Sequence, residues 1–185
     1  MAKTVAFFGL GNMGGPMAAN LVKAGFSVRA FDLVPASVQQ AVKDGCSAAA
    51  SEQAAVEGAD VVISMLPDGA IAERLYIDGA GLLNLIGPAT LVIDCSTIAA
   101  ASSRRIAAEG KQRGIRVVDA PVSGGVAGAQ AATLAFMCGG EAADVEAARE
   151  VLQHMGANIF HAGASGAGQI AKICNNMLLA VHMIG

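Results

Sequence analysis

The sequence predicts an α/β protein with a Rossmann-type fold, a doubly wound and mostly parallel sheet with helices on both faces. Short apolar, β-rich runs alternate with alanine-rich segments of helical length. A glycine-rich stretch, GLGNMG, follows the first of these runs, and an acidic residue, Asp32, ends the second. The 185 residues are 54% hydrophobic and 15% charged, which suits the core of one such domain.

The first half of the chain contains four apolar runs that we assign as strands, at residues 4–9, 27–32, 60–66 and 90–96. The predicted helices between and after them lie at residues 13–25, 71–77 and 99–113. Gly25 ends the first helix. The runs DVVISML and TLVIDCS are apolar without alternation, which is typical of parallel strands buried on both faces.

The second half continues the alternation. RVVDAPVSGG (116–125) is a strand that runs into a glycine loop, and TLAFMCGG (133–140) is a further strand. A helix over 142–155 and a last strand over 158–163 follow. From residue 164 the pattern becomes helical and ends without a capping residue, so we expect the beginning of a long helix there.

Composition excludes several function classes. The net charge of −3, with no basic patch, gives no reason to expect nucleic acid. The four cysteines form no CxxC pair, so neither zinc nor another metal is predicted, and a reduced, cytoplasmic setting is expected. No run is long and apolar enough to predict a membrane span.

The stretch GLGNMG carries Gly9, Gly11 and Gly14 in the G-x-G-x-x-G spacing between a strand and a helix. These glycines permit a tight turn, close approach of the backbone to a pyrophosphate, and close packing of helix on strand. Asp32 lies 18 residues after Gly14, near the separation of about 20 expected for the carboxylate that binds the adenosine ribose. A carboxylate there repels a 2′-phosphate, so the sequence predicts NAD rather than NADP. A glycine turn without a ligand is the alternative.

Ligands of such sheets bind outside the carboxyl ends of the strands. Those ends are predicted at MLPDG (65–69), CSTI (95–98) and PVSGG (121–125). In PVSGG, Ser123 supplies a hydroxyl, and two glycines can expose backbone N–H groups, so the loop can hold a carboxylate. An ordinary loop is the alternative for each of the three.

The stretch GAGQIAKICNN places one lysine, Lys172, among apolar residues. On a helix Gly168, Lys172 and Asn176 share one face, and Gly168 is expected to leave room for a flat ring or a substrate. One reading of Lys172 is a proton acceptor whose pKa burial lowers. The other reading is a surface lysine whose charge extends to water.

Five stretches of the sequence occur in the order in which the β-hydroxyacid dehydrogenases carry them: FFGLGNMGGPMAANLVKAG, MLP, DCSTI, DAPVSGG and GAGQIAKICNN. The match covers essentially all 185 residues. The chain therefore resembles the N-terminal part of that family. The resemblance implies a NAD-binding domain over residues 1–163. It also implies that residues 164–185 begin a connecting helix to a second, all-helical domain.

The resemblance also implies roles for individual residues. Lys172 corresponds to the catalytic acid/base and Asn176 to its partner at the substrate, while Ser123, Gly124 and Gly125 resemble the substrate-binding loop. The implied cofactor-binding residues are Gly9, Leu10, Gly11, Asn12, Met13, Gly14, Asp32, Leu66, Pro67 and Thr97. Ile71 stands where family members often carry Asn or His, so it is left outside the predicted site.

The activity that the resemblance implies is NAD-dependent oxidation of a small 3-hydroxy acid, with 3-hydroxyisobutyrate from valine breakdown as the expected substrate. Two alternatives stay open. One is reduction of a related small semialdehyde of the tartronate, succinic or glyoxylic type, and the other is a non-catalytic NAD-binding module. A homo-oligomer is expected, with association through apolar residues of the last helix.

Overall fold

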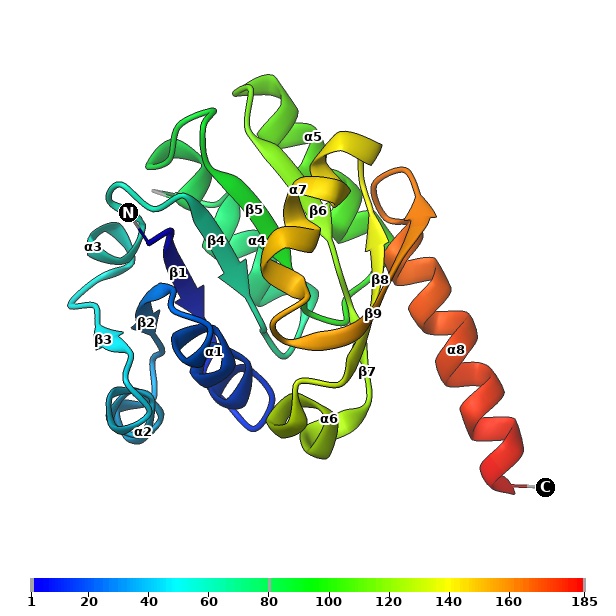
Figure 1. Ribbon diagram of the computed structural model, residues 1–185. Helices are drawn as coiled ribbons and strands as arrows, with labels where there is room; N and C mark the ends of the chain where they lie inside the picture. The colour runs from blue at the N-terminus through cyan, green and yellow to red at the C-terminus, as the bar shows by residue number, and fades with distance from the viewer. Residues whose placement is uncertain (1, 80, 185) are drawn as a thin grey trace.

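In the computed structural model, which describes residues 2–79 and 81–184, nine strands form one sheet among these residues (Figure 1). The strands are β1 (Thr4–Phe8), β2 (Ser27–Phe31), β3 (Ser47–Ala48), β4 (Val61–Ser64), β5 (Leu91–Asp94), β6 (Arg116–Asp119), β7 (Val122–Ser123), β8 (Leu134–Gly139) and β9 (Gly156–Gly163). Six of them follow the order β3-β2-β1-β4-β5-β6, and all neighbouring pairs within that series are parallel. This is the order of a Rossmann-type doubly wound sheet.

The remaining strands extend the sheet beyond β6. Ala120 and Pro121 separate β6 from β7, and both of these strands pair antiparallel with β8. Strand β9 returns parallel to β8, with register shifts at two places. The sheet is therefore mostly parallel, as predicted, with antiparallel pairing confined to this added edge.

The helices are α1 (Gly14–Lys23), α2 (Pro35–Lys43), α3 (Glu52–Val56), α4 (Gly69–Tyr76), α5 (Ala100–Gln112), α6 (Gly125–Ala131), α7 (Ala142–Leu152) and α8 (Ala167–Ile184), with a 3-10 turn η1 (Leu82–Asn84). Alternate residues of β1 build two cores: Val5 and Phe7 join the core under α1 and α7, whereas Ala6 and Phe8 join the core under α3, α4 and α5. Burial on both faces explains why the central strands are continuously apolar.

The predicted fold class is confirmed, but several short elements were not predicted. The segments for which the sequence predicts no element form helices α2 and α3, strand β3 and the turn η1. In addition, α6 follows Gly124, where the sequence predicts a loop. Helix α2 buries only Ala41 fully, and α3 has five residues, so neither shows a strong helical period.

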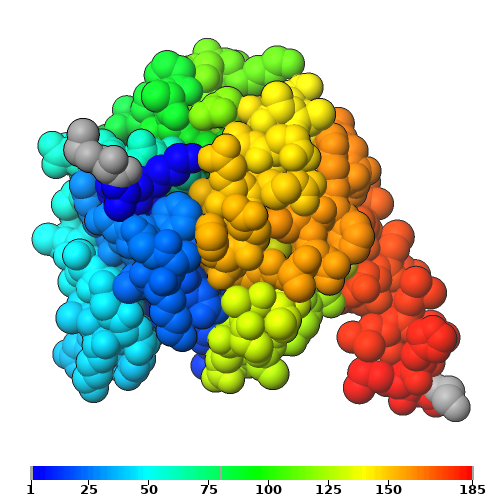
Figure 2. All heavy atoms as spheres, in the orientation of Figure 1, coloured from blue at the N-terminus to red at the C-terminus, as the bar shows by residue number. Residues whose placement is uncertain are grey.

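Helix α8 leaves the body of the protein after its first two turns, and its C-terminal part stands clear of the other elements (Figures 1 and 2). Large apolar side chains are exposed along it: Ile170, Ile173, Met177, Leu178, Leu179, Val181, Met183 and Ile184. Within the described part of the chain, none of the helices has the length and apolar character that a bilayer crossing requires.

Candidate active site

The turn between β1 and α1 is built by glycines that no larger residue can replace without distortion. Gly9 has φ +86°, and a Cβ atom there would lie 2.3 Å from the carbonyl oxygen of Met65. A Cβ atom on Gly14 would lie 1.9 Å from the carbonyl oxygen of Gly9. These contacts bring the start of α1 close to the carboxyl end of β1, as the motif predicts.

Gly11 differs from its two neighbours in the motif, because a Cβ atom added to it would meet nothing within 4 Å. The space in front of it opens into a cleft of about 690 Å³, a volume typical of cofactor sites. The cleft lies where the strand order reverses between β1 and β4, which is the position expected for a dinucleotide.

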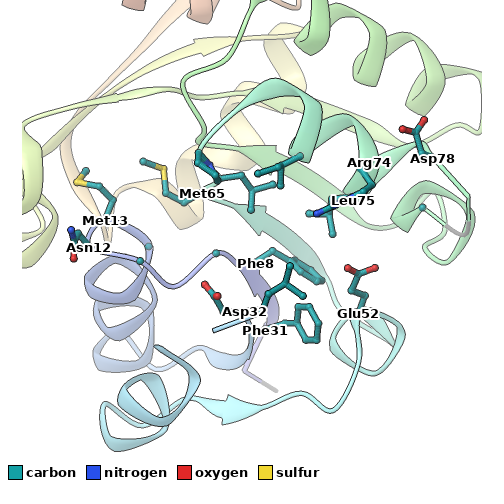
Figure 3. A pocket seen from close by; sticks show the side chains of 18 residues that line it. Phe8, Asn12, Met13, Phe31, Asp32, Glu52, Met65, Arg74, Leu75 and Asp78 are labelled. Carbon is teal, nitrogen blue, oxygen red and sulfur yellow. The ribbon is translucent and has the colours of Figure 1, made fainter. Parts of the chain in front are cut away.

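Figure 3 shows the cleft between two walls, with Arg74 and Leu75 of α4 facing Phe8, Phe31 and Asp32. Predicted cofactor residues among its lining are Gly9, Gly11, Asn12, Met13, Gly14, Asp32, Leu66 and Pro67. Lining residues that the sequence reasoning missed are Phe8, Phe31, Leu33, Glu52, Met65, Ile71, Arg74, Leu75, Asp78 and Gly81. The sequence places Ile71 outside the site because its side chain forms no hydrogen bond, yet an apolar side chain suits a cleft wall.

Asp32 is held below the glycine-rich turn by two backbone groups. The N–H of Leu10 donates to its Oδ2 at 2.6 Å, and the N–H of Val34 donates to its Oδ1 at 2.8 Å. Each carboxylate oxygen has a further lone pair, so ribose hydroxyls can still donate to them. Leu10 therefore contributes to the predicted cofactor site through its backbone N–H, because its side chain is buried in the core.

A buried hydrogen-bond network lies behind the carboxyl ends of β4 and β5. The hydroxyl of Tyr76 donates to Ser64 at 2.7 Å, and Ser64 donates to Oδ1 of Asp94 at 2.8 Å. The N–H of Leu66 donates to Oγ of Ser96 at 2.8 Å. Oδ2 of Asp94 is buried without a partner in the described residues, and burial raises the pKa of this carboxyl group.

The start of α8 is fixed to the end of β6 by Asp119, whose burial raises the pKa of its carboxyl group. Oδ1 accepts from the N–H of Gly166 at 2.7 Å and Oδ2 from the N–H of Gln169 at 3.2 Å. The expectation that Gly168 leaves room for a ligand is wrong. A Cβ atom on Gly168 would lie 2.2 Å from the carbonyl oxygen of Met137, so this glycine lets α8 approach β8.

Lys172 follows one turn later and is 9% exposed. Among the described residues, no hydrogen-bond or ion-pair partner lies within reach of its ammonium group, and desolvation lowers its pKa. Asn176 is exposed to solvent. The neighbouring Asn175, which the sequence reasoning did not select, places Nδ2 3.5 Å from Oγ of Ser123, at the outer limit of a hydrogen bond.

The loop after β7 adopts a conformation that requires glycine. Gly124 has φ +128° and Gly125 has φ +62°, both in the left-handed region. Both residues are exposed, as is Thr97 after β5. The cleft below the glycine-rich turn is not lined by the remaining predicted site residues, which are Thr97, Ser123, Gly124, Gly125, Lys172 and Asn176.

In the described chain, no cluster of three or more His, Cys, Asp or Glu side chains could hold a metal ion.

Comparison with known protein families matches residues 4–163 to the family model described as the NAD binding domain of 6-phosphogluconate dehydrogenase. Among curated relatives, a NAD-dependent L-serine dehydrogenase of Pseudomonas aeruginosa is 58% identical over 99% of the chain and 61% of the relative. A 3-hydroxyisobutyrate dehydrogenase of the same organism is 55% identical over 98% of the chain and 61% of the relative.

Among solved structures, one described as Mycobacterium tuberculosis 3-hydroxyisobutyrate dehydrogenase with L-serine superposes with a TM-score of 0.94. It is 52% identical, and the match covers the whole of this chain and 62% of that one. The chain thus spans about three-fifths of the length of the relatives that it matches.

Proposed function

This chain belongs to the β-hydroxyacid dehydrogenase family, in the part that carries the NAD-binding domain, and we propose that the protein containing it oxidises a short 3-hydroxy acid with NAD⁺. The observation that carries the proposal is Lys172, a buried lysine with a lowered pKa on the helix that follows the cofactor domain. A lowered pKa increases the share of neutral amine, the form that can act as a general base.

The cofactor residues fit a dinucleotide. The open space at Gly11 admits a pyrophosphate next to the backbone, and the start of α1 supplies N–H groups for it. Asp32 offers lone pairs to the two ribose hydroxyls and repels a 2′-phosphate, which favours NAD over NADP. Bound NAD⁺ supplies a hydride acceptor for the carbon that bears the substrate hydroxyl.

The chain's own residues handle the proton and the carboxylate. Neutral Lys172 accepts the proton of the substrate hydroxyl as the carbonyl forms, and in the reverse direction its ammonium group returns that proton. Asn176, one turn later, is assigned to the substrate hydroxyl. Ser123 and the exposed backbone of Gly124 and Gly125 are assigned to the substrate carboxylate.

The names of the relatives support the substrate class. One is a 3-hydroxyisobutyrate dehydrogenase and another an L-serine dehydrogenase. Both of those substrates carry a hydroxyl on the carbon β to a carboxylate. We therefore propose 3-hydroxyisobutyrate as the substrate and L-serine as a second candidate, since a relative at 58% identity is named for it.

The arrangement of the chain supports two further proposals. We assign residues 164–185 to the beginning of a helix that leads to a second, all-helical domain, because the NAD-binding family model ends at residue 163 and the chain covers only 61% of the length of its relatives. We also propose that the protein forms a homo-oligomer, because apolar side chains such as Ile173 and Met177 are exposed along α8. The expected cytoplasmic location stays a prediction.

The test is steady-state kinetics on the full-length protein. NADH formation is measured with 3-hydroxyisobutyrate and L-serine, and NADH consumption with tartronate, succinic and glyoxylic semialdehydes. The proposal predicts the highest kcat/KM for a 3-hydroxy acid. A preference for one of the semialdehydes would favour the sister activity, and NAD binding without turnover of any of these compounds would favour a non-catalytic module.

A further inference from the structure

Gln169 is a fully buried polar side chain that the cofactor and substrate assignments leave without a role. It lies on α8 one turn before Lys172, and its side chain reaches across to the segment after β5. Nε2 donates to the carbonyl oxygen of Ser96 at 2.7 Å, and Oε1 accepts from the N–H of Ile98 at 3.1 Å. The amide therefore pairs with the backbone on both sides of Thr97.

This pairing fixes the orientation of the amide. A carbonyl oxygen can only receive a hydrogen bond and a backbone N–H can only give one, so the two bonds cannot be exchanged by turning the amide over. Both partners are buried, and each of them would be left unsatisfied if the amide were removed. Gln169 is thus held in one position.

The same residue joins three strand ends through hydrogen bonds. The carbonyl oxygen of Ser96 accepts from Nε2 of Gln169, and Oγ of Ser96 accepts from the N–H of Leu66 at the end of β4. The backbone N–H of Gln169 donates to Asp119 at the end of β6. Two hydrogen bonds, joined through Ser96, therefore connect Leu66 at the end of β4 with the turn of α8 that precedes Lys172.

We infer that Gln169 is a positioning residue, which holds Lys172 of α8 at a fixed place relative to Thr97 and to Leu66 at the end of β4. The inference rests on the proposed function, because Lys172 needs this placement only if it exchanges a proton with the substrate. Residues 3 apart on a helix lie on the same side, so a shift of Gln169 moves Lys172 with it. Gln169 itself does not touch the reacting atoms.

The test compares Gln169→Met, which keeps the length of the side chain but has no polar atoms to pair, with Gln169→Glu, which keeps the acceptor for Ile98. Both are made in the full-length protein. Gln39→Met, on the exposed surface of α2, is the matched control. The measurements are kcat and KM, NAD affinity by calorimetry, thermal unfolding, and hydrogen exchange of the Ile98 amide.

For Gln169→Met we expect kcat to fall about 10- to 100-fold, because misplacement by about 1 Å can cost that much. NAD affinity should change less than about threefold, since the cleft is untouched. The Ile98 amide should lose protection in Gln169→Met and keep it in Gln169→Glu. As pH falls, Gln169→Glu should recover kcat relative to Gln169→Met, because a protonated carboxyl can again donate to Ser96.

Loss of Ile98 protection with unchanged kcat would overturn the inference and leave the proposed function standing. An equal fall in kcat and NAD affinity, together with early unfolding, would show a purely structural role and would also overturn it. If Gln169→Met does not fold, the kcat of Gln169→Glu is compared with that of the unmodified protein as pH falls: a rise in their ratio supports the inference, and a constant ratio overturns it. Absence of turnover in the unmodified protein would instead count against the proposed function itself.

Discussion

Asp119 and Gly166 are 47 residues apart in sequence, and the N–H of Gly166 donates to Oδ1 of Asp119 at 2.7 Å in the buried junction between β6 and α8. The other oxygen of Asp119 accepts from the N–H of Gln169. A single carboxylate thus satisfies two N–H groups at the start of the helix that carries Lys172, groups that have no partner within the helix. The junction fixes where α8 leaves the sheet.

Replacement of this carboxylate should weaken the junction. Asp119→Ala leaves two buried N–H groups without partners, and we expect the free energy of unfolding to fall by about 1–3 kcal/mol. Urea denaturation of the variant measures the change. Asp78→Ala removes an exposed carboxylate and serves as the control. Equal stability of the two variants would show that the Asp119 contacts do not stabilise the start of α8.

The two glycines of the phosphate turn should separate folding from cofactor binding. Gly11→Ala meets open space, so stability should change by less than about 0.5 kcal/mol. NAD affinity should nonetheless fall about tenfold or more, because the methyl group occupies the approach to the pyrophosphate.

Gly14→Ala should instead lower the free energy of unfolding by about 1–3 kcal/mol, since its Cβ would overlap the carbonyl of Gly9. Calorimetry and denaturation give both quantities, and unchanged NAD affinity in Gly11→Ala would place the cofactor elsewhere.

Asp94 should give the protein a pH-dependent stability. Burial raises the pKa of this carboxyl group in the folded state, so the folded protein holds its proton more tightly than the unfolded chain. The resulting stabilisation is complete below the unfolded pKa of about 4 and is lost as pH rises through the folded pKa. Asp94→Asn should lack this part of the pH dependence. Denaturation curves at several pH values test it, and a difference between the two proteins that is the same at every pH would contradict it.

Asp32 should govern the choice between NAD and NADP. Asp32→Asn removes the negative charge that repels a 2′-phosphate, but keeps an oxygen that can accept from one of the two backbone N–H groups. We expect NAD to bind more weakly, and we expect the dissociation constant for NADP divided by that for NAD to fall by about tenfold. Binding of both cofactors to each protein gives this ratio. A ratio that does not change would remove Asp32 from cofactor selection.

Much of the fold follows from the sequence, because it depends on local patterns. The apolar runs of β1, β4 and β5, the glycine spacing after β1 and the position of Asp32 each specify their structure with few alternatives. The antiparallel pairing of β8 with β6 and β7 is different. The chain runs on in one direction through Pro121 from β6 to β7 and reverses only after α6, and no short-range pattern in the sequence states which strands β8 then pairs with.

The candidate site was predicted less completely, for a physical reason. Cleft residues such as Arg74 and Glu52 come from helices that no motif marks, and they line one cleft only after the sheet has placed α3 and α4. Gln169 lies next to Lys172 in sequence, yet its contacts with Ser96 and Ile98 span more than 70 residues. The spacing of Gly168 and Lys172 predicts a role at a ligand for Gly168, because no pattern in the sequence indicates its packing against β8.

The most direct measurement is turnover of the full-length protein with Lys172→Ala, followed as NADH formation with 3-hydroxyisobutyrate and with L-serine. Proton transfer by a placed side chain contributes about 10²–10⁴-fold, so kcat should fall by that factor while NAD affinity stays close to that of the unmodified protein. Lys23→Ala, which removes a lysine at the end of α1, is the control and should retain normal turnover. Near-normal turnover by Lys172→Ala would contradict the assignment of Lys172 as the proton acceptor.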